Sequence, residues 1–283
     1  MFRKILIANR GEIAVRIIRA ARELGIETVA VYSTADKEAL HTLLADEAVC
    51  IGPAKSTESY LNMSAVLSAA VLTGAEAIHP GFGFLSENSK FATMCEEVGI
   101  KFIGPSAKVM DLMGDKINAR KQMIKAGVPV IPGSDGEVYT AEEALEIAER
   151  IGYPVMLKAS AGGGGKGIRK VEKPEDLVAA FESASSEAQA AFGNGAMYME
   201  RVIYPARHIE VQILADQHGH VIHLGERDCS LQRNNQKVLE ESPSIAIGKT
   251  LRDRIGSAAV RAAESVGYEN AGTIEFLYDE GKG

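Results

Sequence analysis

Short apolar segments alternate with helical patterns along the first hundred residues, and this alternation limits the folds open to the chain. Residues 4–9 form an apolar run of the buried-strand kind, and residues 13–25 carry apolar side chains at helical spacing. Further segments of both kinds follow: strands over 27–33, 48–52, 75–81 and 100–106, and a helix over 64–74. The alternation predicts an α/β fold with a doubly wound parallel sheet up to about residue 105.

A sheet of this type often binds a dinucleotide, with an acidic residue after the second strand on the ribose. Asp36 occupies that place, but the first turn, residues 8–14, contains only Gly11. The glycines that would admit a pyrophosphate are missing, so the sequence argues against a nicotinamide cofactor. Asp36 is therefore interpreted as a helix cap or a solvated loop residue.

The composition argues against several classes of partner. A formal net charge of −7 makes nucleic acid a poor match, because phosphate backbones attract basic surfaces. The N-terminus turns polar too early for a signal peptide, and no apolar run is long enough to cross a bilayer, so no membrane is expected. Cys50, Cys95 and Cys229 are unclustered, which is typical of reduced, mostly buried thiols in a cytoplasmic protein.

The second part of the chain has a different pattern. Residues 106–127 are predicted to form a helical connector, and residues 128–137 are a break rich in proline and glycine. Helices and strands then mix without strict alternation: helices over 141–152, 174–192 and 249–266, and strands over 153–160, 167–171, 196–203, 207–216, 221–230 and 271–280. The short turn over residues 217–220 predicts an antiparallel hairpin between its two flanking strands.

The most distinctive segment is the glycine-rich loop KASAGGGGKG, residues 158–167. It contains G-x-G-x-x-G, but any glycine run does so, and Gly167 follows Lys166 where a Walker loop needs Ser or Thr. Strands precede and follow the loop, so no helix N-terminus completes an anion site. The arrangement indicates a flap whose backbone N–H groups approach nucleotide phosphates, with Lys158 as a fixed charge. The alternative is a surface turn with two solvated lysines.

Several motifs occur together and in order along the chain. They are ILIANRGEIAVRI, HPGFGFLSEN, MGDK, GVPVIPG, KASAGGGGKG, MERVI, RHIEVQ, ERDCSLQRNNQKVLEESPS and GTIEFL. From MGDK onward they resemble the ATP-grasp ligases, and the whole set, which covers the entire chain, resembles biotin carboxylase.

The resemblance implies an incomplete ATP-grasp domain, with an α+β lid and an antiparallel sheet, after a Rossmann-like domain. Its four expected parts are an N-terminal biotin carboxylase (pre-ATP-grasp) domain over 1–113, a connector over 114–132, a lid subdomain with the glycine flap over 133–203, and the truncated start of a second ATP-grasp subdomain over 204–283.

The resemblance also implies a nucleotide site. Two lysines would hold the phosphates of ATP beneath the flap, and the strand that contains Glu200 would receive adenine. Phosphoryl transfer leaves little covalent work to a protein, so fixed charges of this kind carry much of the catalysis. Asn235 stands where the family more often has histidine. The residues implied to bind ATP are Lys116, Lys158, Gly164, Gly165, Glu200, Arg201, Val202, Ile203, His208, Gln232 and Asn235.

Further positions match residues that contact the other ligands of the family. Lys237 corresponds to a lysine that binds bicarbonate, a role suited to a compact ammonium group. Glu275 corresponds to a carboxylate that holds Mg²⁺, or Mn²⁺, between the phosphates, since such cations prefer oxygen ligands. His79, Phe82 and Gly83 lie in a loop similar to the one beside biotin, with phenylalanine in place of the commoner tyrosine.

The activity that the resemblance implies is the first half-reaction of acetyl-CoA carboxylase in fatty acid synthesis. ATP and bicarbonate would give carboxyphosphate, and biotin on a biotin carboxyl carrier protein would be carboxylated for use by a carboxyltransferase. The complete enzyme is expected to be a homodimer. The family's main catalytic arginine and glutamate fall beyond Gly283, so the chain is expected to be an inactive fragment.

Two alternatives of different kinds remain open. One is another ATP-grasp ligase, which makes a carboxamine or carbamoyl phosphate; residues 79–88 and 232–238 favour biotin carboxylase over it. The other is a nucleotide-binding module without catalytic activity.

Overall fold

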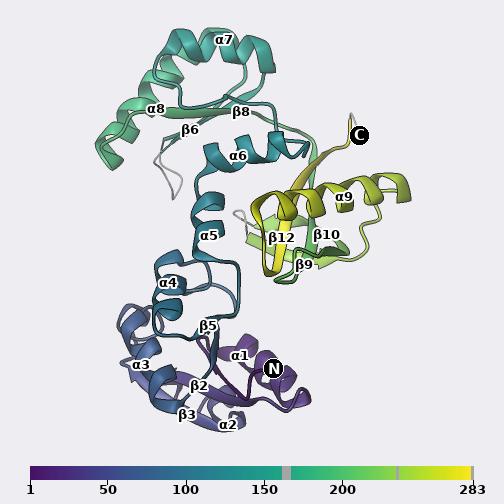
Figure 1. Cartoon of the computed structure of the whole chain (residues 1–283). Helices are drawn as coiled ribbons and strands as arrows, with labels where there is room; N and C mark the ends of the chain where they lie inside the picture. The colour runs from purple at the N-terminus through teal and green to yellow at the C-terminus, as the bar shows by residue number, and fades with distance from the viewer. Residues whose placement is uncertain (161–166, 234–235, 282–283) are drawn as a thin grey trace. The chain divides into compact units, whose positions relative to one another are not determined.

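The computed structural model of the chain describes residues 1–160, 167–233 and 236–281, apart from the side chain of Lys116. The chain divides into two compact units (Figure 1). The first contains Met1–Gly114 with the short segments Leu214–His220 and Val266–Ala271. The second contains Asp115–Ile213, Val221–Ser265 and Gly272–Gly283.

The first unit is built on a parallel sheet whose strands are β1 (Lys4–Ile7), β2 (Glu27–Ser33), β3 (Glu47–Gly52), β4 (Ala77–His79) and β5 (Lys101–Phe102). Their order is β3-β2-β1-β4-β5. The chain builds outward from β1 to β3 and then returns to the other side of β1. The predicted doubly wound parallel sheet is thereby confirmed. Folds of this kind bind ligands at the carboxyl ends of the strands where the order reverses, here β1 and β4.

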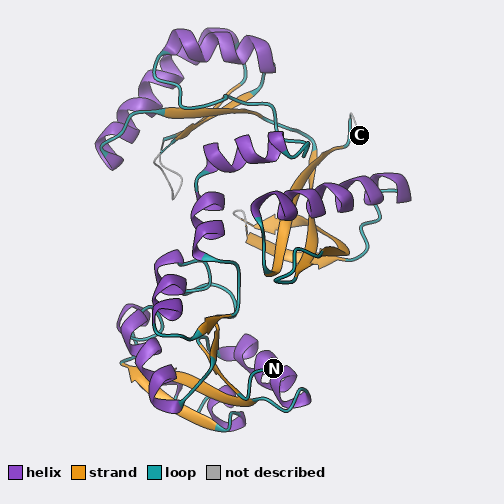
Figure 2. Ribbon diagram, viewed as in Figure 1, coloured by secondary structure: helices purple, strands orange, loops and turns teal. Residues whose placement is uncertain are grey.

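Helices pack on both faces of this sheet (Figure 2). They are α1 (Gly11–Glu23), α2 (Leu40–Leu44), α3 (Met63–Thr73) and α4 (Ser89–Glu97), with short 3₁₀ turns η1 (Thr34–Asp36) and η2 (Ser56–Glu58). Successive residues of β1 divide between the faces: Leu6 joins the core that contains α3 and α4, and Ile5 and Ile7 join the core that contains α1. The sequence analysis missed α2, which is too short to show a helical period, and α4.

The predicted helical connector consists of two helices, α5 (Ala107–Gly114) and α6 (Lys116–Lys125). Asp115 separates them, because its carboxylate caps α6 by accepting hydrogen bonds from the amides of Ile117 and Asn118, each at 3.1 Å. The second compact unit begins at this same residue.

The second unit contains an antiparallel sheet in which β6 (Val155–Ala159) lies between β7 (Ile168–Val171) and β8 (Met197–Arg201). Two helices, α7 (Ala141–Ile151) and α8 (Leu177–Phe192), cover one face of it, and the turn η3 (Pro174–Asp176) precedes α8 (Figure 1). Alternate residues of β6 and β8 form this packed face, so the residues between them point to the opposite face. The glycine-rich loop joins β6 to β7, two paired strands, as predicted.

A second sheet in this unit consists of β9 (Ala206–Ala215), β10 (Val221–Arg233), β11 (Gln236–Glu241) and β12 (Asn270–Asp279), in the order β11-β10-β9-β12. The predicted pairing of β9 with β10 is confirmed. The sequence analysis missed β11, whose residues are all exposed and show no apolar alternation. Helix α9 (Lys249–Val266) has the predicted bounds and packs Ala258 and Ala262 against Ile274 and Phe276 of β12.

Asp36 is neither a helix cap nor a solvated residue, so that interpretation was wrong. Its carboxylate is buried and accepts hydrogen bonds from Arg10 Nε at 2.9 Å, Arg10 Nη2 at 2.5 Å, Ser33 Oγ at 2.9 Å and the Tyr60 hydroxyl at 2.6 Å. The bond from Arg10 is the main cause that lowers the pKa of Asp36, against the opposing effect of burial. The ends of β1 and β2 are thus joined by an ion pair between the buried carboxylate of Asp36 and the exposed Arg10.

The three cysteines are free thiols; Cys95 and Cys229 are buried and Cys50 is exposed. Among the described residues, no helix is both long and apolar enough to cross a bilayer.

We predict that Asp36→Asn lowers the free energy of unfolding by about 2 kcal/mol at pH 7, because charge-assisted bonds to a buried group are lost. Tyr60→Phe, which removes one of these bonds, should cost about 1 kcal/mol. Since the pKa of Asp36 is lowered in the folded chain, its contribution is complete above its ordinary value of about 3.9 and declines at lower pH. Urea unfolding at pH 7 and pH 3 measures both effects; an Asp36→Asn variant as stable as the parent at pH 7 would restore the solvated interpretation.

Candidate active site

The face of the three-stranded sheet that α7 and α8 leave uncovered carries Lys158 and Glu200. Lys158 on β6 lies opposite Tyr198, and Glu200 on β8 lies opposite Met156, so the two charged residues are diagonal neighbours. The ammonium of Lys158 donates a hydrogen bond to Glu200 Oε2, and both side chains remain partly exposed. The structure therefore brings together two of the residues predicted to bind ATP.

The outer edge of β8 is partly occupied by the chain itself. On this edge the amide of Arg201 donates to the carbonyl of Pro132, and the carbonyl of Met199 accepts from the amide of Ser134, each at 2.8 Å. The amide of Val202 faces β6 instead and donates to the carbonyl of Pro154. Among the residues that the structure describes, the amide of Ile203 has no such acceptor. A ligand that pairs with this edge would therefore find its backbone donor at Ile203.

The second group of predicted residues lies on the four-stranded sheet, on the face opposite α9, called the open face below. The ammonium of Lys237, on β11, donates to Glu275 Oε1 on β12 at 2.7 Å and to Glu210 Oε2 on β9. Glu210 Oε1 in turn accepts from Arg227 Nε on β10 at 2.6 Å. Glu240 Oε2, also on β11, lies 3.5 Å from Arg227 Nε, so the four strands supply one network of two cations and three carboxylates.

Two pKa values in this network are shifted in the direction that keeps the groups charged. Burial raises the pKa of Glu210, but hydrogen bonds from Lys237 and Arg227 outweigh burial and lower it overall. Burial lowers the pKa of Lys237, but Glu210 and Glu275 outweigh burial and raise it overall. Lys237 is therefore a fixed ammonium group at neutral pH.

His208 and Gln232 lie on the same sheet, but their hydrogen bonds join them to neighbouring residues of β10. The amide of His208 donates to Ser230 Oγ at 3.1 Å, and Gln232 Nε2 donates to the carbonyl of Cys229 at 3.0 Å. Neither side chain joins the charged network. Gly164, Gly165 and Asn235 lie outside the described residues, as does the side chain of Lys116, although its backbone begins α6.

The loop predicted to lie beside biotin follows β4 in the first unit, at the end of the strand where sheet order reverses. Asn9, which follows β1, donates through Nδ2 to the carbonyls of Pro80 at 2.8 Å and Phe82 at 2.7 Å. Gly81 has a φ of +65° and lies so close to Asn9 that a Cβ would stand 2.8 Å from its Nδ2. His79 is mostly enclosed, and burial lowers its pKa.

Phe82 and Gly83, at the outer part of this loop, are exposed. The aromatic side chain of Phe82 is thus available to a ligand, while the backbone beneath it is fixed by Asn9.

Sequence reasoning missed Asn9, Glu210 and Arg227. Glu210 stands between the buried residues Ile209 and Val211, which is a detectable signal, because a carboxylate within a buried strand needs a partner. No comparable signal marked Asn9, whose role depends on a loop 71 residues away.

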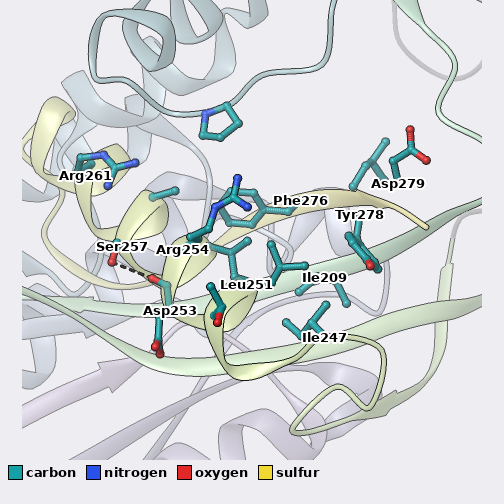
Figure 3. Close-up of a pocket in the computed structure, with 15 residues that line it drawn as sticks. Ile209, Ile247, Leu251, Asp253, Arg254, Ser257, Arg261, Phe276, Tyr278 and Asp279 are labelled. Carbon is teal, nitrogen blue, oxygen red and sulfur yellow. Dashed lines mark hydrogen bonds between the residues drawn. The ribbon is translucent and has the colours of Figure 1, made fainter. Parts of the chain in front are cut away.

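A cavity of about 670 Å³ lies on the other face of the four-stranded sheet (Figure 3). Ile209, Phe276 and Tyr278 line it from the sheet, and Leu251, Arg254 and other residues line it from α9. Glu210 and Glu275, the sequence neighbours of Ile209 and Phe276, point to the open face, where Lys237 binds them. The cavity is therefore separate from the charged network.

Two sets of residues could be considered for a metal ion. Carboxylates of Glu210 and Glu240 and the thiol of Cys229 come within 4.8 Å of one another, but Glu210 is already paired with two cations and the pKa of Cys229 is raised to about 11 by burial. Glu275 is the better candidate: its side chain is 58% exposed, and a single carboxylate with phosphates and water suits Mg²⁺.

Comparisons with known proteins agree along the whole chain. Residues 1–110 match the family described as biotin carboxylase, N-terminal domain, and residues 115–283 match the family described as carbamoyl-phosphate synthase L chain, ATP binding domain. Biotin carboxylase 1 of Bacillus subtilis is 59% identical over 279 residues, which are 99% of this chain and 62% of that protein.

The solved structures give the same result. The structure of the biotin carboxylase–β-γ-ATP complex from Campylobacter jejuni superposes with a TM-score of 0.90 and 55% identity, covering 99% of this chain and 63% of that one. The biotin carboxylase subunit of pyruvate carboxylase superposes with a TM-score of 0.80 and 55% identity, over 99% of this chain and 62% of its own. The chain spans about 62% of the length of the biotin carboxylases of Bacillus subtilis and Nostoc that it matches. Since both of its domains and its relatives agree, the chain belongs to the biotin carboxylase family.

Proposed function

We propose that this chain acts as part of an ATP-dependent biotin carboxylase, a ligase that activates bicarbonate as carboxyphosphate and carboxylates biotin on a carrier protein. The observation that carries the proposal is the ammonium of Lys237 held by Glu210 and Glu275 on an exposed sheet face. A relative supports it: the biotin carboxylase domain of Hydrogenobacter thermophilus 2-oxoglutarate carboxylase, 54% identical with a TM-score of 0.87, is described as a dimer with MgADP, ADP and bicarbonate.

In this proposal, the nucleotide lies against the exposed face of the three-stranded sheet. Lys158 neutralises phosphate charge, Glu200 accepts from the adenine amino group, and the edge at residues 201–203 pairs with the base through its backbone. Gly164 and Gly165 cover the phosphates, and Lys116, His208, Gln232 and Asn235 complete the site. The pair of Lys158 with Glu200 supports the first two roles, because it already holds a cation and an acceptor beside the flap.

Lys237 binds bicarbonate and holds it for attack on the γ-phosphate of ATP. A raised pKa suits this role, since the ammonium keeps its charge over the whole range in which bicarbonate is an anion. Glu275 holds Mg²⁺, or Mn²⁺ in its place, and that cation, when bound, neutralises the phosphate oxygens during transfer. Lys237 and Glu275 are in contact, so the anion and the phosphate chain would meet at this point of the sheet.

For the second substrate, biotin, we propose that His79, Phe82 and Gly83 form the contacts. The support is a loop fixed by Asn9 at the carboxyl end of a parallel sheet. For the domain organisation we propose the bounds expected from the sequence: 1–113, 114–132, 133–203 and 204–283.

We propose as partners a biotin carboxyl carrier protein, a carboxyltransferase and a second copy of the enzyme, in an acetyl-CoA carboxylase of fatty acid synthesis. The relatives named for pyruvate and for 2-oxoglutarate offer other acyl acceptors, which product analysis would distinguish. We propose a cytoplasmic location, supported by three unpaired thiols, although some relatives are chloroplastic.

The nucleotide assignment predicts that the chain binds MgATP, with no comparable binding of NAD. Lys158→Met should weaken ATP binding by about 2 kcal/mol, roughly 30-fold, because one charge-assisted contact is removed. Isothermal titration calorimetry with both nucleotides measures this. A matched control is Lys249→Met, because Lys249 lies on α9, away from this sheet face, and pairs with the exposed Asp253. NAD binding tighter than ATP binding would remove the basis of the proposal.

The anion assignment predicts that Lys237→Met impairs bicarbonate-dependent ATP cleavage far more than ATP affinity. A suitable background is a chimera in which residues 1–283 replace the matching 62% of Bacillus subtilis biotin carboxylase 1. We expect a loss of kcat/KM for bicarbonate on the order of a hundredfold or more, since a donor to the reacting anion is lost. If ATP affinity fell by the same factor, Lys237 would belong to the nucleotide site.

We predict that residues 1–283 by themselves do not carboxylate biotin, because the relatives that do so use a longer chain. Small errors in position are costly: about 1 Å can lower a rate on the order of a hundredfold. The measurement is ADP release dependent on bicarbonate and biotin, beside the Bacillus subtilis enzyme. Turnover at the rate of that enzyme would refute the prediction, and stimulation by ammonia instead of biotin would favour the carbamoyl-phosphate alternative.

A further inference from the structure

On the open face of the four-stranded sheet, the two oxygens of Glu210 serve different cations. Oε2 accepts from the ammonium of Lys237, whereas Oε1 accepts from Arg227 Nε at 2.6 Å and forms an ion pair with Arg227 Nη2 at 2.5 Å. The carboxylate is nearly enclosed, with 6% of its side chain exposed. Because the guanidinium occupies one oxygen, the ammonium is confined to the other.

Arg227 is itself anchored to the strand that carries Glu275. Its third nitrogen, Nη1, donates to Gln212 Oε1 at 3.2 Å, and Gln212 Nε2 donates to the carbonyl of Gly272 on β12 at 2.8 Å. The three nitrogens of the guanidinium are therefore all engaged within the sheet. A side chain bound in this way acts on its neighbours and not directly on a substrate.

We infer that Arg227 is a positioning residue: through Glu210 it sets where the ammonium of Lys237 stands and leaves that charge available to an anion. Without the guanidinium, Glu210 Oε1 would lose its partner, and the ammonium would move to bridge both oxygens, away from Glu275. One cation would then serve Glu210 and Glu275, Glu240 would also lose its guanidinium neighbour, and the net negative charge would repel an anion. The inference depends on the proposed function only for the identity of that anion.

The opposite face of the sheet supplies a matched control. Arg252, on α9, donates through Nε to the buried carboxylate of Glu226 at 2.7 Å. The two arginine side chains are equally exposed, 29% for Arg227 and 30% for Arg252. Removal of either leaves a buried carboxylate without its guanidinium, which destabilises the fold. Of the two buried carboxylates, Glu210 and Glu226, only Glu210 is paired with Lys237 among the described residues.

The test is the ¹⁵N–¹H signal of the Lys237 ammonium in the chain, assigned through its loss in Lys237→Arg. We expect this signal to shift and its proton exchange to accelerate in Arg227→Met, and to stay unchanged in Arg252→Met. Arg227→Lys, which keeps the charge but not the planar fork, should give an intermediate shift and serves if Arg227→Met does not fold. In a Glu210→Gln background, Arg227→Met should have no further effect on the signal.

An unmoved Lys237 signal in both Arg227 variants, or an equal change in Arg252→Met, would overturn the inference. A kinetic measurement in the chimera adds the functional result. Arg227→Met should lower kcat/KM for bicarbonate on the order of a hundredfold, while KM for ATP stays within about twofold. If the chimera without substitutions cleaved ATP at the same rate with and without bicarbonate, the proposed function would be refuted. The NMR signal of Lys237 would still test the role of Arg227 in that case.

Discussion

The buried carboxylate of Glu210 is the interaction on which the arrangement of the open face depends. A charge enclosed in this way is costly unless it is paired and its lone pairs are satisfied. Here the partners come from β10 and β11, so the ionised state of Glu210 requires those two strands to hold their places beside β9. The lysine that results is charged, fixed and partly exposed, which are the properties that an anion site needs.

The two faces of strand β10 carry different networks: one contains the partner of Glu210, and the other contains contacts that stabilise the unit. Arg227 faces the open side, whereas its neighbours Glu226 and Asp228 are buried on the side of α9. There, Glu226 binds Arg252 and the amide of Ser244, and Asp228 binds the hydroxyl of Ser244 at 3.0 Å. Residues on the two faces of one strand thus fix the segment before α9 and bind the carboxylate of Glu210.

The sequence was sufficient to predict helices and strands whose buried residues follow one another directly or recur at a regular spacing. The five parallel strands are apolar runs, and α9 has both helical spacing and clear ends, so their positions were confirmed. Exposed β11 has no such pattern, and five-residue α2 is too short to display one. Local pattern also misjudged Asp36, because its burial depends on Tyr60, which is 24 residues away in sequence.

The site was predictable only in part, for a related reason. Lys237 and Glu275 were predicted from the resemblance to biotin carboxylase. The alternation of residues along a strand predicts which face of the sheet a residue occupies, but it does not predict which residue it contacts. The partners of Lys237 are 27 and 38 residues distant, and that of Arg227 is 17 residues distant, so only the sheet order brings them together. The contacts that join Glu210 to Lys237 and Arg227 therefore became visible only in the folded chain.

The alternation of β10 also limits how this protein can change in length. An insertion or deletion of one residue before Arg227 would exchange the two faces of the strand. A carboxylate would then stand beside Glu210, and the guanidinium would point toward α9, so that both networks would fail together. Variation in length among descendants of this gene should therefore collect in the turn at residues 216–220, where hydrogen bonds are local, and spare the strand itself.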